Sequence, residues 1–202
     1  ATLGLTLPAG TGKTIFLRGV QVPRSAPPDT QGVLYGSING CWFIERAVGV
    51  LFQPSGLVVY LGGATVNDWI RGVVSTIYER FGGRVVDVDV VFDGIGGMQI
   101  FINAVEQTVE QSSGGNPPSW SDEMYLLYLD AGALGSSGYP YTGSIRGIAI
   151  VSTAATAEQI REIHRTGVFP ADWYVAGGAG VPSVDTWGSL SYTGFLSSST
   201  GF

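Results

Sequence analysis

The sequence predicts an all-β protein, an antiparallel jelly-roll β-sandwich with one short C-terminal helix and extended termini. The first observation behind this prediction is an alternation of apolar and polar residues within residues 84–105, which is the period of a strand. The second is a series of short apolar runs separated by turn residues across residues 32–72. The third is composition, because 31 glycines among 202 residues suit tight turns between short strands.

Residues 84–105 are expected to form two strands joined by a glycine-rich bend, and the rest of the sheet is organised around them. One face of the first strand is apolar and consists of Val86, Val88, Val90 and Phe92. The other face carries Asp87 and Asp89, and we interpret it as a solvated outer face. Glycines within residues 94–97 permit the positive φ of a hairpin bend, so an antiparallel pair is predicted. Such a ribbon must bury its apolar face against another sheet, which makes a sandwich the expected architecture.

Further short strands are predicted on both sides of this ribbon. Before it, we expect strands at residues 3–7, 14–22, 33–38, 41–48, 49–53 and 57–61. The regular spacing of the last four indicates an antiparallel meander. Residues 73–81 fit either a helical turn or a strand, and we interpret them as strand or irregular because β-branched residues dominate. After the ribbon and a long polar loop, strands are predicted at residues 124–129 and 143–152.

One short helix is predicted over residues 157–165. Thr156 offers a side-chain oxygen to the first turn, and Gln159 can reach back to complete a capping box. Gly167 supplies a left-handed stop, and Pro170 prevents the helix from resuming. The apolar stripe expected to lie on the sandwich consists of Ala157, Ile160, Ile163 and His164.

The chain divides into three predicted segments. Residues 1–29 are an N-terminal arm or strands, residues 30–173 are the jelly-roll domain, and residues 174–202 are a Gly/Ser/Thr-rich C-terminal arm. The first boundary is placed within the proline-rich stretch at residues 23–32. The C-terminal arm has too little apolar periodicity for a core of its own, so it is either docked on a neighbouring subunit or a disordered extension.

Charge and cysteine content argue against several classes of function. A net charge of −6 opposes binding to the phosphate backbone of nucleic acids, which needs clustered Lys and Arg. Cys41 is the only cysteine, so an intrachain disulfide or a cysteine-based metal cluster cannot form. No apolar run reaches the roughly 18 to 20 residues of a membrane span. Because only 13% of the residues are charged, we expect partner chains to cover part of the surface, most simply in a homo-oligomer.

No residue is predicted to be catalytic. Residues 9–14, AGTGKT, contain glycines and a lysine, but Leu7 occupies the position of the first glycine of a phosphate-binding loop, so a turn between two strands is expected. Glycosidases need two carboxylates across one sugar bond, and the chain lacks the Glu-x-Asp-x-Glu run of jelly-roll glucanases. His164 is the only histidine, which supports neither a Ser/His/Asp triad nor a His-based zinc site. The protein is therefore expected not to be an enzyme.

Carbohydrate binding is the function that the aromatic residues favour. Sugar rings pack on exposed aromatic faces that lie among polar side chains at a loop-lined rim. The candidates in such contexts are Trp69, Trp120, Tyr139 and Tyr141. The alternative for each of them is ordinary packing over the sandwich.

Motifs in the second half of the chain resemble those of a known family. Residues 143–167 contain, in order, a Gly-Ser-Ile strand, a short segment, a Thr-capped Ala-Glu-Gln helix and a glycine. Asp93-Gly94 matches a hairpin turn, and residues 102–104 match a strand that ends in Asn-Gly, except that Ala104 replaces the usual glycine. Residues 167–173, GVFPADW, are similar to a Gly-Val-Pro-Ala-Asp segment of phage virion proteins. Together these motifs resemble the concanavalin A-like lectin superfamily, in particular laminin-G-like modules of phage and bacterial surface proteins, over about residues 30–173.

This resemblance implies a lectin-like jelly-roll domain in a non-enzymatic virion protein, such as a phage capsid fibre, decoration or tail component. Its partners would be other virion subunits and the polysaccharide of a host cell surface. The alternative is a carbohydrate-binding module of a secreted or surface adhesin, so the expected location is the virion or the extracellular space. No cofactor is expected apart from calcium, which some laminin-G-like domains bind and which Asp93 or Asp130 would help to hold.

Overall fold

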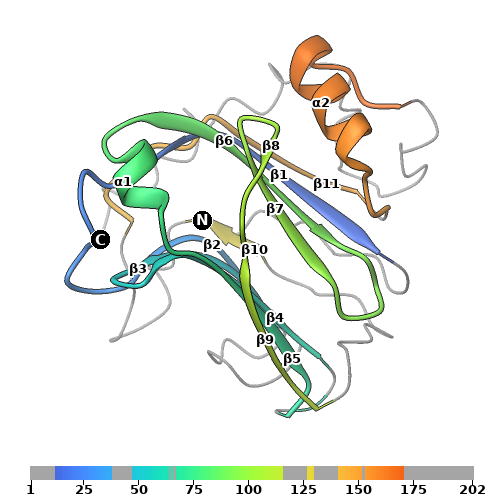
Figure 1. The fold of residues 1–202 in the computed structure, drawn as a ribbon, viewed down its shortest axis with the longest axis horizontal. Helices are drawn as coiled ribbons and strands as arrows, with labels where there is room; N and C mark the ends of the chain where they lie inside the picture. Colours follow the sequence, from blue (N-terminus) through green and yellow to red (C-terminus); the bar gives the residue numbers. More distant parts are fainter. Residues whose placement is uncertain are drawn as a thin grey trace.

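The computed structural model describes residues 12–37, 47–63, 65, 67–115, 127–129, 141–151 and 153–170. These residues form two antiparallel sheets that face each other (Figure 1), which confirms the predicted jelly-roll β-sandwich. The five-stranded sheet has the order β11-β1-β6-β7-β8, formed by Gly147–Val151, Lys13–Gln21, Val85–Phe92, Met98–Ile102 and Val105–Glu106. The six-stranded sheet has the order β10-β2-β3-β4-β5-β9, formed by Leu127–Leu129, Gln31–Ser37, Ala47–Gln53, Gly56–Gly62, Trp69–Val74 and Glu110–Gly114.

The main core lies between the two sheets. The predicted hairpin is confirmed as β6 and β7, which pair from Val88↔Ile102 to Phe92↔Met98. Its inward side chains meet those of β2-β3-β4-β5, which form an antiparallel meander as predicted. The strand boundary expected between residues 48 and 49 is wrong, because β3 runs without a break from Ala47 to Gln53. Because the inward residues of both sheets are apolar, burying them between two layers removes most of their surface from water and stabilises the sandwich. The most deeply buried members include Val88, Val90, Ile100, Val50, Phe52 and Val59, all with no exposed surface.

A second core lies on the outer face of the five-stranded sheet, under helix α2 (Ala157–Thr166). Ile160 and Ile163 of the helix pack there with Phe16, Val91 and Phe101 of the sheet. The interpretation of this face as solvated is therefore wrong, and Asp89 has no exposed surface. The alternation placed the acidic residues correctly on one face, but it could not show that a helix distant in sequence covers them.

Strand β1, which belongs to the predicted N-terminal segment of residues 1–29, lies between β11 and β6 in the centre of the five-stranded sheet. Its pairing with β6 shifts register between Leu17 and Val20. At this bulge Gly19 adopts φ 65, a left-handed conformation that favours glycine. Arg18 points outward by the regular alternation, and the extra residue then shifts the alternation by one position, so that Leu17 and Val20 both point into the main core.

The segment after β5 differs from its prediction. Residues 73–81 were interpreted as strand or irregular, but the strand ends at Val74 and helix α1 spans Ile77–Phe81. Ile77 has no exposed surface, and Phe81, one helical turn later, packs against the same core. Helical spacing of these two residues therefore outweighed the strand preference of their neighbours.

Helix α2 confirms its prediction in detail. Both hydrogen bonds of the capping box between Thr156 and Gln159 are present, and Gly167 ends the helix with φ 71. Within the described ranges the helices are too short to cross a membrane. The predicted strand at residues 3–7, Cys41 and the C-terminal arm at residues 174–202 lie outside the described residues.

The turn between β7 and β8 supplies a test of the backbone geometry. Asn103 and Ala104 have φ values of 51 and 61, the pattern of a two-residue turn that ordinarily places glycine second. Because a left-handed alanine costs roughly 1 kcal/mol, Ala104→Gly should raise the free energy of unfolding by up to about 1 kcal/mol. Ala149→Gly, in the interior of β11, is the matched control and should lower it by about 1 kcal/mol. Urea denaturation measures both, and a clear loss of stability in Ala104→Gly would contradict the assigned turn.

Candidate functional site

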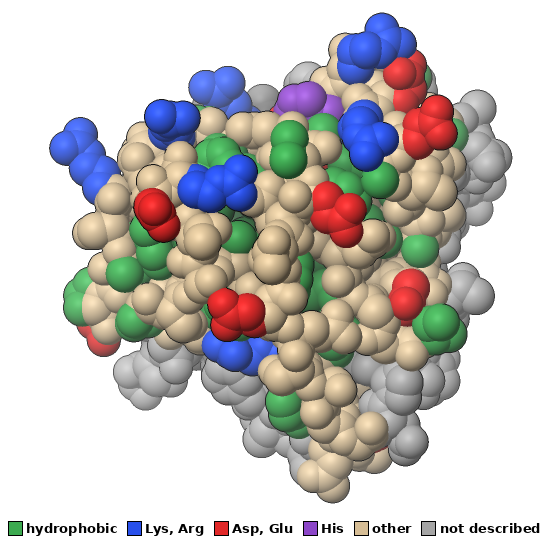
Figure 2. All heavy atoms as spheres, in the orientation of Figure 1, with side chains coloured by type: hydrophobic (Ala, Val, Ile, Leu, Met, Phe, Trp, Pro, Cys, Tyr) green, Lys and Arg blue, Asp and Glu red, His purple; other side chains and the backbone are tan. Residues whose placement is uncertain are grey.

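A cavity of about 490 Å³ lies where the C-terminal end of α2 meets the outer face of the five-stranded sheet. The end of β1, the start of β6, the turn after β7, the start of β11 and the end of α2 converge there. Figure 2 shows the histidine in purple on this side of the molecule, with Lys and Arg side chains on either side of it. The polar side chains that line the cavity are Arg18, Asp87, Asn103, Arg146 and His164.

Arg18 reaches this face through the ordinary alternation of β1, because Leu17 points into the main core and Phe16 lies on the outer face. Its guanidinium pairs with Asp89 through Nη1 and lies 3.7 Å from Asp87 Oδ2 through Nε. It also lies 5.3 Å from the ring centroid of Phe16, within the range of a cation–π interaction. The side chain of Arg18 is 12% exposed and that of Asp89 is 0% exposed, so α2 and the sheet enclose an ion pair.

Asp87 joins the sheet to the helix. Its Oδ1 accepts a hydrogen bond of 2.9 Å from the backbone N–H of Gly19. Its Oδ2 lies 3.4 Å from His164 Nδ1, and His164 is 35% exposed at the rim of the cavity. The carboxylate of Asp87 thus contacts the bulge of β1 at Gly19, the guanidinium of Arg18 and, through His164, the last turn of α2. The sequence predicted that His164 packs on the sandwich, whereas its ring nitrogen faces Asp87.

Asn103 and Arg146 complete the wall with hydrogen-bond donors. The Asn103 side-chain oxygen accepts from Asp87 N at 2.9 Å, and Asn103 N donates to Asp87 O at 3.0 Å. Because its oxygen is engaged, Asn103 is left with its amide N–H groups for other partners. Arg146 N donates to Arg18 O at 2.8 Å, which fixes its backbone beside β1. Within the described ranges no carboxylate lies within ion-pair distance of the exposed Arg146 side chain.

Close approach of the backbone shapes the cavity around Arg146. A methyl group on Gly19 would lie 2.5 Å from Arg146 Cγ, so the absence of a side chain at Gly19 lets the arginine stem cross β1. Gly147 and Gly167 also line the cavity. Apolar contact is offered by Val85, which is 46% exposed. The cavity therefore combines rigid backbone, charged donors and one exposed apolar side chain, as small-molecule sites do.

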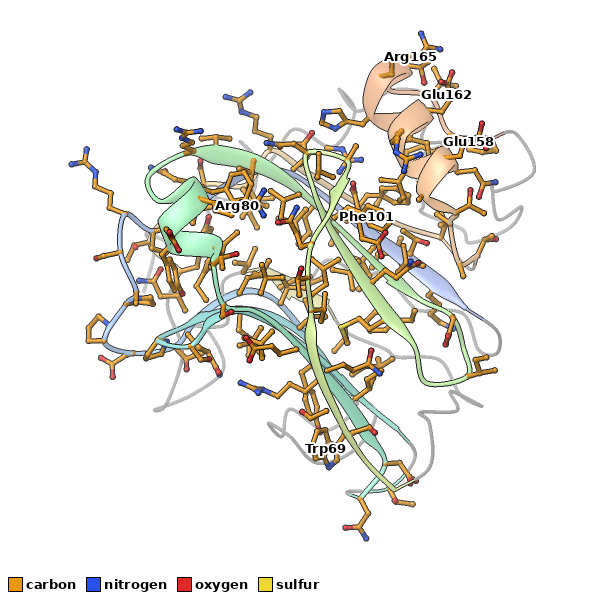
Figure 3. The ribbon with its side chains drawn as sticks, viewed as in Figure 1. Trp69, Arg80, Phe101, Glu158, Glu162 and Arg165 are labelled. Atoms are coloured by element: carbon orange, nitrogen blue, oxygen red, sulfur yellow. The ribbon has the colours of Figure 1, made fainter. Side chains whose placement is uncertain are left out.

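Two of the four predicted aromatic residues, Trp69 and Tyr141, belong to the part of the chain that the structure describes, and they lie in different places. Tyr141 is 9% exposed, stacks on Phe52 with ring centroids 6.1 Å apart, and donates a 2.6 Å hydrogen bond to Gln21 O. Trp69 is half-buried and stacks on Tyr60 at 6.4 Å (Figure 3). Phe52 pairs with Leu57 near the start of β4 and Trp69 pairs with Gly62 at its end, so the two aromatic contacts lie toward opposite ends of that strand. Trp120 and Tyr139 lie outside the described residues.

Tyr141 also borders a second cavity, of about 320 Å³, beside the proline-rich loop at residues 23–28. Its hydroxyl is engaged by Gln21 O and lies 3.2 Å from Ser144 O. These contacts fit the alternative interpretation of Tyr141 as a packing residue. Sugar binding by Trp69, Trp120, Tyr139 and Tyr141 stays a prediction.

The predicted calcium ligands have different outcomes. Asp93 Oδ1 accepts hydrogen bonds from Ile95 N at 2.8 Å and Gly97 N at 2.7 Å, so it stabilises the bend between β6 and β7. Asp130 lies outside the described residues. Across the part of the chain that the structure describes, no three His, Cys, Asp or Glu side chains gather in a way that could hold a metal ion.

Sequence analysis missed Arg18 and Arg146, although a signal for them exists. Each is followed by glycine between apolar residues, in Leu17-Arg-Gly-Val20 and Ile145-Arg-Gly-Ile148. The two segments lie side by side, because Arg18 pairs with Gly147. The same pattern at Ile70-Arg-Gly-Val73 lies in the six-stranded sheet, so the motif alone does not identify a site.

Comparison with known proteins supports the fold. No protein-family model and no curated protein sequence matches the chain. Among solved structures it is similar to the NanB sialidase of Streptococcus pneumoniae, with a TM-score of 0.55, 18% identity, and coverage of 80% of this chain and 26% of that one. It is also similar to the botulinum neurotoxin serotype D ligand-binding domain in complex with N-acetylneuraminic acid, with a TM-score of 0.53, 10% identity, and coverage of 79% and 37%.

A third similar structure is the binding domain of botulinum neurotoxin DC in complex with rat synaptotagmin II, with a TM-score of 0.55, 10% identity, and coverage of 77% and 36%. The chain thus spans between 26% and 37% of the length of these three proteins. At such identities the likeness concerns the β-sandwich alone.

The buried carboxyl group of Asp89 should make the stability of the protein depend on pH. Burial raises the pKa of Asp89 from 3.8 to about 6, although the Arg18 guanidinium opposes the rise. The folded state therefore binds more protons than the unfolded state between about pH 4 and 6, and stability falls as pH rises through this window. The loss attributable to this one group is roughly 3 kcal/mol.

Urea denaturation at several pH values, with Asp89→Asn as the control, measures this effect. The difference in free energy of unfolding between the two proteins should change across pH 4 to 6 and be constant above it. Parallel curves throughout would contradict the burial of an ionisable carboxyl at this position.

Proposed function

We propose that the chain is a non-enzymatic carbohydrate-binding domain of the concanavalin A-like type. The observation that carries this proposal is the cavity under α2, where hydrogen-bonding side chains converge from strands β1 and β6, the turn after β7, the residue before β11 and helix α2. Sugars present many hydroxyl groups, and fixed donors and acceptors beside an apolar surface recognise such ligands. The shared sandwich with a structure in complex with N-acetylneuraminic acid supports the same function.

The arrangement of acidic groups favours binding over hydrolysis. A glycosidase places two carboxyl groups on either side of the bond to be cleaved. Among the described residues that line the cavity, Asp87 supplies the one carboxyl group. Asp89 lies behind it with no exposed surface and is paired with Arg18. A sugar in this cavity would therefore meet one carboxylate and several hydrogen-bond donors.

We further infer that the domain belongs to a virion structural protein, such as a phage capsid fibre, decoration or tail component, that attaches to host-surface polysaccharide. Low charge, a single cysteine and an aromatic Gly/Ser/Thr-rich C-terminal segment suited to docking on neighbouring chains support this inference. The second candidate is a carbohydrate-binding module of a secreted or surface adhesin. Both place the protein at a virion or outside a cell, and both use the same glycan-binding cavity.

Glycan binding is tested on an array that carries neutral and acidic oligosaccharides. The intact chain should bind at least one class, and His164→Ala should weaken binding about tenfold by removing one wall of the cavity. Trp69→Ala and Trp120→Ala examine the aromatic residues as an alternative site. If binding is lost in those variants and kept in His164→Ala, the cavity is not the site; if the intact chain binds no glycan, the function itself is wrong.

The oligomeric state of the chain distinguishes a virion structural protein from an isolated carbohydrate-binding module. The intact chain should form a stable multimer when its mass in solution is measured by light scattering at micromolar concentration. A virion subunit is also expected in particles purified under native conditions. A monomer at all concentrations, together with absence from such particles, would contradict the virion role while leaving carbohydrate binding unaffected.

A further inference from the structure

We propose that the cavity under α2 binds a sugar that carries a carboxylate, with the guanidinium of Arg146 as its partner. This inference rests on the proposed carbohydrate-binding function and names the class of sugar. It begins from a contrast in charge. The whole chain has a net charge of −6, yet the side chains that line this cavity include two arginines and one carboxylate.

The two arginines differ in what already surrounds them. Arg18 is 12% exposed and is engaged by Asp89 and Asp87, so it serves as part of the wall. Arg146 is exposed, and no carboxylate of the described residues lies within ion-pair distance of it. An arginine offers parallel N–H groups that match the two oxygens of a carboxylate. Arg146 is thus the cation that can accept an anionic partner from solution.

The neighbouring donors favour the same type of ligand. The Asn103 oxygen is occupied by Asp87 N, which leaves its amide N–H groups as donors at the cavity wall. Asp87 and His164 offer the remaining polar atoms, which suit the hydroxyl groups of a sugar ring. Val85, 46% exposed, provides an apolar surface against which the ring or an acyl substituent can pack.

Charge balance limits how negative the ligand is. Asp87 and Asp89 both pair with Arg18, so among the described residues Arg146 is the cation left for a ligand, and a second negative charge would lie near these carboxylates. A single carboxylate at Arg146 meets one unmatched guanidinium and leaves the network intact. The volume of about 490 Å³ lies within the usual range for small-molecule sites, roughly 300 to 1,000 Å³.

The single histidine of the chain makes this proposal directly measurable. His164 lines the cavity, so the proton resonances of its imidazole report on occupancy by NMR without any need for assignment. The probes are 3′-sialyllactose, a glucuronic acid disaccharide, the methyl esters of both, lactose, and a sulfated lactose. A carboxylate glycan should shift the His164 resonances in a saturable manner, whereas its methyl ester and lactose should not.

Matched variants identify the partner of the carboxylate. Arg146→Ala should weaken binding of the active glycan about 10- to 100-fold, since a charge-assisted hydrogen bond is lost. Arg146→Lys keeps the charge without the planar pair of donors, so its affinity for the glycan should lie between those of the intact chain and of Arg146→Ala. The control is Arg165→Ala, which removes an exposed arginine of α2 that pairs with Glu162 (Figure 3). This control should bind as the intact chain does.

Each other outcome has a definite meaning. Equal binding of lactose or of the methyl esters would overturn the carboxylate assignment and leave the proposed function in place, as would binding of the sulfated glycan alone. Binding that leaves the His164 resonances unmoved, or that is unchanged in Arg146→Ala, would overturn this cavity as the site. Failure of every glycan to bind would overturn the proposed function as well.

Discussion

The ion pair between Arg18 and Asp89 is the interaction on which the outer half of this structure depends. Asp89 has no exposed surface, and a buried carboxyl group is tolerated only when its charge is matched or neutralised. The pair forms because the alternation of β1 places Arg18 on the outer face, and the bulge at Gly19 then returns Val20 to the core. Asp87 then connects the bulge to His164 and so to the last turn of α2. The walls of the cavity follow from this one arrangement.

The sandwich and the cavity rely on different physical effects. Between the sheets, apolar burial is non-directional, so many similar side chains would fill the same space. Under α2, the geometry depends on specific hydrogen bonds and charges, which fix orientation more than they add stability. A rigid apolar core beneath a polar face is a suitable base for recognition, because Arg146 and Asn103 are held beside strands β1 and β6 by backbone hydrogen bonds to Arg18 and Asp87.

The apolar alternation in β6 and the capping residues of α2 made much of the fold predictable. Local signals of this kind act between residues near in sequence, and so the hairpin, the meander and the limits of the helix could all be derived. The burial of Asp89 could not be, because it depends on a helix that begins 68 residues later at Ala157. Residues 77–81 were predicted to be strand or irregular because of their strand preference, but they form helix α1. Packing of Ile77 in the core outweighed that local preference. The site was missed for the same reason, as Arg18 and Arg146 are 128 residues apart in sequence and meet only through the pairing of β1 with β11.

The most direct test of this account is a double-mutant cycle between Arg18 and Asp89, with each residue replaced by leucine and the free energy of unfolding measured in urea at pH 7. Each single variant leaves a buried group without its main partner, whereas the double variant replaces the pair with apolar side chains of similar size. The account predicts that the double variant is far more stable than the sum of the two single losses implies, with a coupling energy of about 2 kcal/mol or more. A coupling energy near zero would contradict the enclosed ion pair and the cavity built around it.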